Sequence, residues 1–267
     1  MNGILYGLAD SWVIAKRNLI KIKRVPEILI FVLISPIMFV LLFAYVFGGS
    51  ITIPGGSYRE FLIAGIFAQT VVFGATFTGA GLAEDMEKGV INRFRSLPMS
   101  GIAVVAGRTA SDVVYNVLSL VIMSLTGLLV GWRIRGSVVD AIAGFALLLL
   151  FAYAFSWVMA LVGLLVPSQE VVNNASFLVL FPLTFIANTF VPSDNLPGPL
   201  RIFAEWNPIS SVTLATRDLF GNIPIGTPEP TAWPLQNPVI YSLIWVAIII
   251  AVFAPLTVAQ YRRVAQR

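Results

Sequence analysis

Six long apolar stretches divide the chain, and each is about 20 residues or longer, which is enough for an α-helix to cross a lipid bilayer. The stretches are Ile28–Phe47, Phe61–Ala83, Thr109–Val130, Ala141–Val166, Val171–Val191 and Val239–Val258. Charged residues collect in the segments between them. The pattern therefore predicts an all-α, polytopic membrane protein with six transmembrane helices, in which residues 1–267 form a single transmembrane domain.

The first 25 residues repeat apolar positions at three- and four-residue spacing, which is typical of an amphipathic helix. Trp12 belongs to the apolar face, whereas Lys16, Arg17 and Lys21 lie opposite it or at its edge. Such a basic helix suits the membrane interface beside anionic lipid. We expect residues 1–25 to form a cytoplasmic interface helix, which acts either as an anchor alone or also as a lever that touches a cytoplasmic partner.

Residues 84–108 form a polar interruption between the second and third stretches. Acidic residues come first and basic residues follow, an order that the helix dipole favours in a short helix. Its apolar positions recur at four- and three-residue spacing: Met86, Val90, Phe94 and Leu97. Pro98 is expected to end this helix. The segment is too short and too charged to span, so it is either a docking helix for a groove on another protein or an interfacial connector.

Residues 192–237 form a proline-rich segment on the opposite side of the membrane. Leu200–Trp206 and Ser210–Phe220 are two short amphipathic pieces, which predict short helices that enter the outer leaflet and return, or else a plain extracellular loop. Irregular backbone at that depth requires cover by protein or water. Gly221–Asn237 is predicted to be an extracellular loop.

Composition narrows the class of protein. The chain is 58% apolar and 11% charged, with a mean hydropathy of +0.88, whereas soluble domains are about 25% charged. A soluble enzyme and a nucleic-acid binder are therefore excluded. The absence of Cys and His removes disulfides, thiol nucleophiles and Cys/His metal sites. None of its lysines lies in a phosphate-cradling loop, so we expect no catalytic residue, metal or cofactor on this chain.

The distribution of charge predicts the topology. Of the 17 Lys and Arg residues, twelve lie on the side of the membrane that holds both termini, and five lie on the other side. Positively charged loops stay in the cytoplasm, so both termini are predicted to be cytoplasmic. The first 25 residues lack the pattern of a cleavable signal peptide, and we expect the first span to be retained as an anchor.

Polar residues within the spans are few. Asp112 is the only charged one, and we expect it to cap its helix or to reach the cytoplasmic interface rather than to contact a substrate. Gln69, Asn116 and Asn188 are candidates for a substrate path. Proton-coupled secondary transporters usually carry ionisable residues at depth, and a membrane enzyme needs a catalytic set, so both classes are disfavoured. The glycine-rich second span predicts close helix packing.

Taken in order, these segments resemble the membrane permease of ABC-2 type transporters, especially its daunorubicin-resistance-like branch. The cytoplasmic segment is similar to the acidic–Gly–basic–Pro signature of that family through Glu84, Glu87, Gly89, Arg93 and Pro98. A longer series is similar to the family's fifth span and return loop: Phe181–Leu183, Phe190–Pro192, Leu196–Pro197, Asn207–Ser210 and Arg217–Leu219. Ile186–Asn188 departs from the Ser-Gly pair of many members, which affects the outer gate.

The resemblance implies a role for each segment. It implies a coupling helix that seats in a cytoplasmic ABC ATPase, formed by Glu84, Asp85, Glu87, Gly89, Arg93, Phe94 and Pro98. It implies an outer gate with re-entrant helices at Pro192, Pro197, Asn207, Pro208 and Arg217. Two ATPase copies would bind ATP and Mg and join two permease copies, identical or different, in the plasma membrane of a bacterium.

The resemblance also implies export of a hydrophobic or amphipathic drug or of a lipid-like molecule. Two alternatives remain at this point: export of a lipid-linked polysaccharide, and a secondary transporter of a different class.

Overall fold

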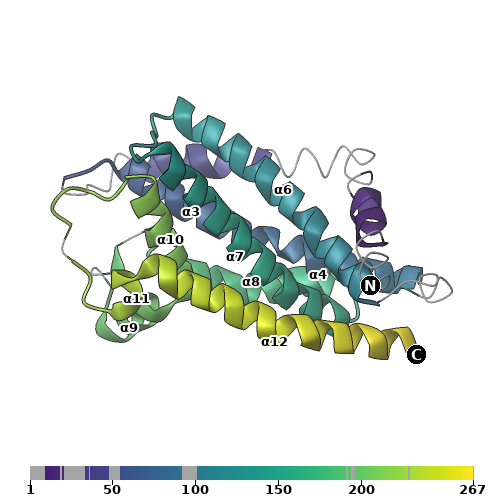
Figure 1. Cartoon of the computed structure of the whole chain (residues 1–267). Helices are drawn as coiled ribbons and strands as arrows, with labels where there is room; N and C mark the ends of the chain where they lie inside the picture. Colours follow the sequence, from purple (N-terminus) through teal and green to yellow (C-terminus); the bar gives the residue numbers. More distant parts are fainter. Residues whose placement is uncertain are drawn as a thin grey trace.

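The computed structural model describes residues 10–18, 20, 34–35, 37–47, 55–91, 101–190, 192–193, 196–227 and 229–266. Long helices run side by side along the molecule (Figure 1). The helix at residues 10–18 and the last turns of the helix that ends at residue 266 lie at one end, and a group of short helices lies at the opposite end. The described ranges contain long apolar helices and no strands, so the predicted all-α fold is confirmed.

Five helical segments are long and apolar enough to cross a membrane. They are Tyr58–Glu87, Ile102–Leu129, Val138–Leu165, Gln169–Ile186 and Pro238–Ala265. These segments correspond to the second to sixth predicted spans. The first predicted span lies partly outside the described residues, and its described part contains the shorter apolar helix Ile37–Val46, which ends in the π-helix η1 (Phe43–Phe47).

The second span consists of two helices, α3 (Tyr58–Gly74) and α4 (Thr76–Glu87), which meet at Ala75. Its glycines allow other segments to approach closely. A Cβ atom at Gly163 of α7 (Val138–Leu165) would lie only 2.7 Å from the Cα of Gly79, which confirms the expectation of close packing.

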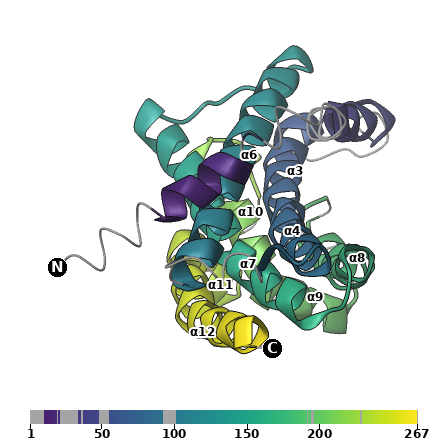
Figure 2. The same cartoon turned by 90° about the vertical axis from the view of Figure 1, so that its right-hand side faces the viewer.

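Helix α7 occupies the centre of the molecule. It packs against α3, α4, α6 (Gly101–Leu129), α10 (Pro208–Leu219) and α12 (Pro238–Gln266). Figure 2 looks along the molecule from the end that holds residues 10–18 and the last turns of α12. In this view α6 and α12 lie on different sides of α7, and α8 (Gln169–Ile186) lies beside α4. Phe67, Trp132 and Phe220 pack edge-to-face in the core between these helices.

The short helices at the other end are α9 (Gly198–Trp206), α10 and α11 (Trp233–Gln236) (Figure 1). Helices α9 and α10 correspond to the two short helices predicted there. The structure corrects the prediction of a loop over residues 221–237, because α11 forms a single helical turn there. Pro234 can occupy the start of this turn, since the first turn of a helix needs no amide donor.

Candidate functional site

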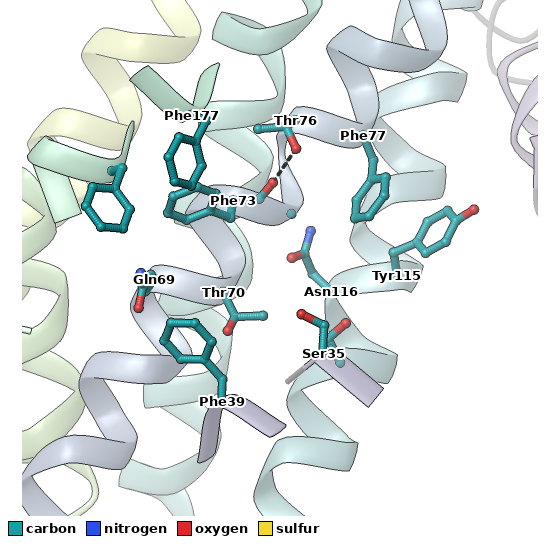
Figure 3. Close-up of a pocket in the computed structure, with 13 residues that line it drawn as sticks. Ser35, Phe39, Gln69, Thr70, Phe73, Thr76, Phe77, Tyr115, Asn116 and Phe177 are labelled. Carbon is teal, nitrogen blue, oxygen red and sulfur yellow. Dashed lines mark hydrogen bonds between the residues drawn. The ribbon is translucent and has the colours of Figure 1, made fainter. Parts of the chain in front are cut away.

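A cavity of about 370 Å³ lies between α3, α4, α6, α8 and the helix at residues 37–47 (Figure 3). Six aromatic side chains line it: Phe39, Phe73, Phe77, Tyr115, Phe177 and Phe181. Hydroxyl and amide groups are interspersed among the rings: Ser35, Gln69, Thr70, Thr76, Asn116 and Ser119. A wall of this kind suits a molecule with an aromatic body and a few polar substituents.

The junction between α3 and α4 shapes one wall of the cavity. Its helical hydrogen bonding is interrupted at Ala75, and the Thr76 hydroxyl donates to the Phe73 carbonyl at 2.7 Å. A side chain at Gly74 would place its Cβ 2.6 Å from Oδ1 of Asn116. Glycine at this position therefore lets α6 bring the Asn116 amide to the cavity.

Stacked phenylalanines continue from the cavity along α8. The ring centroids are 5.0 Å apart for Phe177 and Phe181, 4.1 Å for Phe181 and Phe185, and 4.7 Å for Phe185 and Phe190. Phe190 also stacks on Phe43 of η1 at 4.6 Å. The four-residue spacing of the first three rings places them on one helix face. Together these rings connect the cavity to the end of the molecule at which α9 and α10 lie.

Helix α6 faces α4 with a series of polar side chains. Arg108 donates to the Phe77 carbonyl at 2.9 Å, and the Thr78 hydroxyl donates to the Asp112 carboxylate. The Asn116 amide donates to the Asp112 carbonyl oxygen at 2.9 Å. Asp112 is 1% exposed and lies well inside α6, so the expectation that it caps the helix or reaches the interface is wrong.

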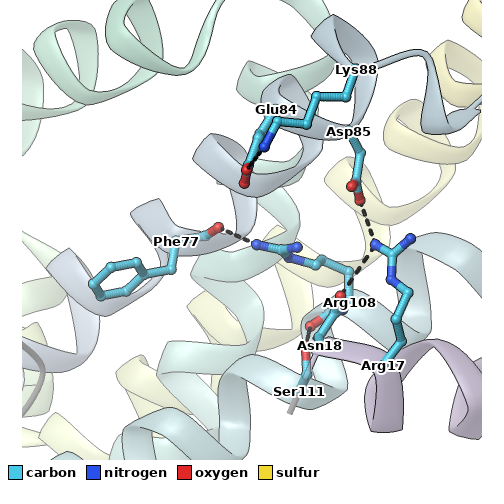
Figure 4. A network of polar contacts seen from close by, with 8 residues as sticks. All are labelled: Arg17, Asn18, Phe77, Glu84, Asp85, Lys88, Arg108 and Ser111. Carbon is cyan, nitrogen blue, oxygen red and sulfur yellow. Dashed lines mark hydrogen bonds and ion pairs between the residues drawn. The ribbon is translucent and has the colours of Figure 1, made fainter. Parts of the chain in front are cut away.

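A polar network ties the helix at residues 10–18 to the last turn of α4 and to α6 (Figure 4). Arg17 forms an ion pair with Asp85 at 2.7 Å, and the Asn18 amide donates to the Ser111 hydroxyl at 3.2 Å. Lys88 pairs with Glu84 at 2.6 Å, and this hydrogen bond and the Glu84 charge raise the pKa of Lys88. The network therefore joins the amphipathic helix to the last turn of the second span and to α6.

Arg217 joins three segments at the opposite end. Its side chain is buried, and it donates to the carbonyls of Phe61 at 2.8 Å and Thr189 at 2.9 Å. Its guanidinium also lies 3.5 Å from the centre of the Phe61 ring, a cation–π distance. Asn207 supports the same region, since it caps α10 by accepting from the Ile209 amide and donates to the Leu183 carbonyl at 2.8 Å.

Comparisons with a family model and with curated proteins agree on one family. The description "ABC-2 type transporter" applies to the family model that matches residues 10–220, which include the cavity, the polar network and Arg217. The chain belongs to the ABC-2 type transporter family. It is an ABC-2 permease and a multi-pass membrane protein, and permeases of this family work with ATPase subunits in ABC transporters.

Three curated proteins illustrate the similarity. The chain is 34% identical to the daunorubicin resistance ABC transporter permease protein DrrB1 of Streptomyces coeruleorubidus, over 92% of this chain and 83% of that protein. It is 23% identical to the probable doxorubicin resistance ABC transporter permease protein DrrC of Mycobacterium tuberculosis, over 86% and 80% of the two chains. It is 24% identical to the putative transport permease ycf38 of Cyanophora paradoxa, over 80% and 75%.

The acidic residues of the predicted coupling segment occupy the last turn of α4 in this ABC-2 permease. The sequence pattern predicted that Glu84, Asp85 and Glu87 begin a separate surface helix, and that prediction is wrong. Helix α4 ends at Glu87, and Gly89 has a φ of 65°, which interrupts the helix because glycine adopts this left-handed conformation without strain. Arg93, Phe94 and Pro98 lie outside the described residues.

On the predicted interface helix, Trp12 and Lys16 are exposed, Arg17 pairs with Asp85, and Lys21 lies outside the described residues. The side chains of this helix that turn toward the protein are Ile14, Ala15 and Asn18. Trp12 therefore points away from the other helices.

The predicted path residues separate into two places. Gln69 and Asn116 line the cavity of the permease, whereas Asn188 lies outside it and its backbone amide donates to the Ser210 hydroxyl of α10 at 3.1 Å. The aromatic wall of the cavity was not predicted from the sequence. The four-residue spacing of Phe177 and Phe181 was visible in the sequence, but their shared cavity depends on contacts with α3 and α6.

Among the predicted outer residues, Arg217 and Asn207 bring α3, α8 and α10 together, as described above. Pro208 is the first residue of α10, and Pro197 directly precedes α9, positions at which proline is well tolerated. Pro192 is partly buried in the connection between α8 and α9.

Proposed function

We propose that this ABC-2 permease is the membrane-spanning subunit of an ATP-driven exporter that moves a hydrophobic or amphipathic drug, or a lipid-like molecule, out of the cell. The observation that carries this proposal is the aromatic cavity between α3, α4, α6 and α8. Its volume of about 370 Å³ falls within the range of small-molecule sites and suits a compact amphiphile better than a polysaccharide chain. The printed names of two similar permeases, which refer to daunorubicin and doxorubicin resistance, support the same substrate class.

The energy for export comes, in this proposal, from a separate cytoplasmic ABC ATPase that binds ATP and Mg. The sequence contains no nucleotide-binding motif, so in this proposal ATP hydrolysis takes place on the separate ATPase. Two ATPase copies join two permease copies in the plasma membrane of a bacterium, with both permease termini in the cytoplasm. The ATPase docks at the segment after α4, next to the network that includes Arg17 and Asp85.

Movement at that segment has a route to the cavity. The segment follows α4 directly, and α4 meets α3 at Ala75, beside the cavity wall. Closure of the ATPase dimer displaces the end of α4, and the helices around the cavity exchange between inward-open and outward-open arrangements. The stacked rings on α8 provide an apolar surface along which an aromatic substrate leaves.

The proposal is tested with the permease and its partner ATPase purified together and reconstituted in lipid vesicles. Phe181→Ala removes a ring from the cavity wall, and we expect it to weaken substrate-stimulated ATP hydrolysis and transport about tenfold, since the lost contact area is worth one to two kcal/mol. Leu178→Ala is the control, because Leu178 lies on the same helix, is 76% exposed and does not line the cavity.

Equal effects of the two substitutions would contradict a role for the cavity in transport. The permease alone should hydrolyse no ATP above background. Turnover by the permease alone would overturn the assignment of hydrolysis to a separate subunit.

A further inference from the structure

Asp112 is a charged residue enclosed within a membrane-spanning helix, and its surroundings point to a ligand. We define the α6 seam as the line along which α6 faces the second span. Three pairs of residues face each other across it, the first of each pair on the second span and the second on α6: Gly74 and Asn116, Thr78 and Asp112, and Gly81 and Arg108. Helix α4 packs mainly on α7 and α8 and contacts α6 at fewer positions. The seam is therefore a narrow, buried polar boundary within an otherwise apolar bundle.

The carboxylate of Asp112 is only partly satisfied within the seam. One oxygen accepts a hydrogen bond from Thr78, and the other oxygen, Oδ1, is buried without a hydrogen-bond partner among the described residues. Arg108 lies one turn away, but its guanidinium crosses Gly81 and donates to the Phe77 carbonyl. Asp112 therefore keeps an acceptor position that a donor on a ligand can fill.

The unpaired carboxylate oxygen belongs to a residue that does not itself line the cavity but lies one helical turn along α6 from Asn116, which does. Asn116 lines the cavity and donates to the backbone carbonyl of Asp112, four residues earlier on the same helix. One helical turn, about 5.4 Å, therefore separates the two positions. The rings of Phe77 on α4 and Tyr115 on α6 also line the cavity. They stack with their centroids 5.9 Å apart.

This combination of groups is the one that recognises an organic cation. A carboxylate accepts a strong, charge-assisted hydrogen bond from an ammonium group, and neighbouring aromatic faces attract the same charge. Ionisable residues inside membrane spans mark substrate or ion pathways when they lie within the bundle. We propose that Asp112 binds the ammonium group of cationic amphiphiles whose aromatic part occupies the cavity, so that the exporter prefers such cations over neutral molecules with the same ring system.

This inference rests on the proposed export function, and a matched pair of probes separates the two. The probes are a planar aromatic compound with a primary alkylamine and its N-acetyl derivative, which has the same rings without the charge. Transport of both is measured with the reconstituted permease and ATPase. Export of both probes with equal apparent affinity by the unaltered complex would overturn the role of Asp112 and leave the export function intact, whereas export of neither would overturn both.

The decisive variant is Asp112→Asn, which has the same shape and can still accept from Thr78. We expect it to weaken the apparent affinity for the amine about tenfold and to leave that for the N-acetyl probe within about twofold, because a single charge-assisted contact is lost. Asp112→Glu keeps the charge and should retain part of the preference. Glu170→Gln is the matched control, since Glu170 is an exposed carboxylate in the first turn of α8, and it should keep the full preference.

A purely structural role for Asp112, such as balancing the charge of Arg108, gives a different pattern. In that case Asp112→Asn weakens transport of the two probes equally, or leaves the preference for the amine unchanged. Either result would overturn the assignment of an ammonium site. Transport of the N-acetyl probe by the variant also reports that it is folded and coupled, so a loss confined to the amine is specific.

Discussion

The guanidinium of Arg217 is enclosed where α3, α10 and the end of α8 meet, and it is paired with backbone carbonyls rather than with a carboxylate. We predict that Arg217→Ala destabilises the permease, because the carbonyls of Phe61 and Thr189 lose their donor and each buried group left unpaired costs about 1–3 kcal/mol. The stability of Arg217→Lys should lie between that of the unaltered permease and that of Arg217→Ala, since a lysine cannot reproduce the fork geometry of arginine. Thermal unfolding in detergent measures the change.

Arg201→Ala serves as the control for this prediction. Arg201 pairs with Glu205 at 2.7 Å on the surface of α9 and is 38% exposed, so its loss should change stability by less than about 1 kcal/mol. If Arg217→Ala unfolds at the same temperature as Arg201→Ala, the buried carbonyl contacts do not stabilise the outer end.

At the scale of single residues, the sequence indicated which residues matter more reliably than it predicted their surroundings. The ordered motifs singled out Arg217 and Asn207, and both make the contacts that hold the outer end together. Asp112 was assigned to the wrong environment, because its position near one end of an apolar stretch gives its approximate depth and not its neighbours. Its burial depends on Thr78 and the glycines of the second span, which the chain brings to α6 only after folding.

At the scale of elements, the ion pair between Arg17 and Asp85 links the helix at residues 10–18 to the last turn of α4. Acidic residues at the C-terminal end of a helix are unfavourable because of the helix dipole, and basic partners offset this effect. We predict that Asp85→Arg lowers substrate-stimulated ATP hydrolysis, because like charges then separate the amphipathic helix from the segment next to the proposed ATPase contact. The ratio of stimulated to basal hydrolysis measures coupling.

The paired substitution Arg17→Asp with Asp85→Arg tests this interpretation. It restores opposite charges at the same two positions and should recover a large part of the stimulation. A double variant that is no more active than Asp85→Arg would show that the pairing itself does not contribute to coupling.

Hydropathy predicted the long helices well, since each needs only its own apolar residues to be recognised. The interruptions within them were harder to predict. The junction at Ala75 has no proline to mark it, and the acidic turn of α4 was assigned to a following helix because the polarity changes at Glu84 while the backbone continues to Glu87. The backbone changes direction at Gly89 instead, where the positive φ requires glycine.

At the scale of the whole molecule, the helices form a bundle with two chemically different ends. One end holds the last turns of α12 and the network around Arg17 and Asp85, and the other end holds the short helices and Arg217 (Figure 1). The cavity and its stacked rings lie between these two ends. Which of the two ends faces the cytoplasm stays a prediction, made from the unequal distribution of basic residues along the sequence.

The absence of cysteine allows a direct test of that orientation, because each introduced cysteine is the only thiol in the chain. Thr227 is exposed in the connection between α10 and α11, and Arg263 is exposed near the end of α12. We predict that a membrane-impermeant maleimide labels Thr227→Cys in intact cells and labels Arg263→Cys only after the membrane is opened. Positive residues are retained in the cytoplasm, and twelve of the 17 basic residues lie on the Arg263 side. Labelling of Arg263→Cys in intact cells would reverse the topology and would place the network around Arg17 beyond the reach of a cytoplasmic ATPase. The unaltered chain, which carries no thiol, gives the background for both measurements.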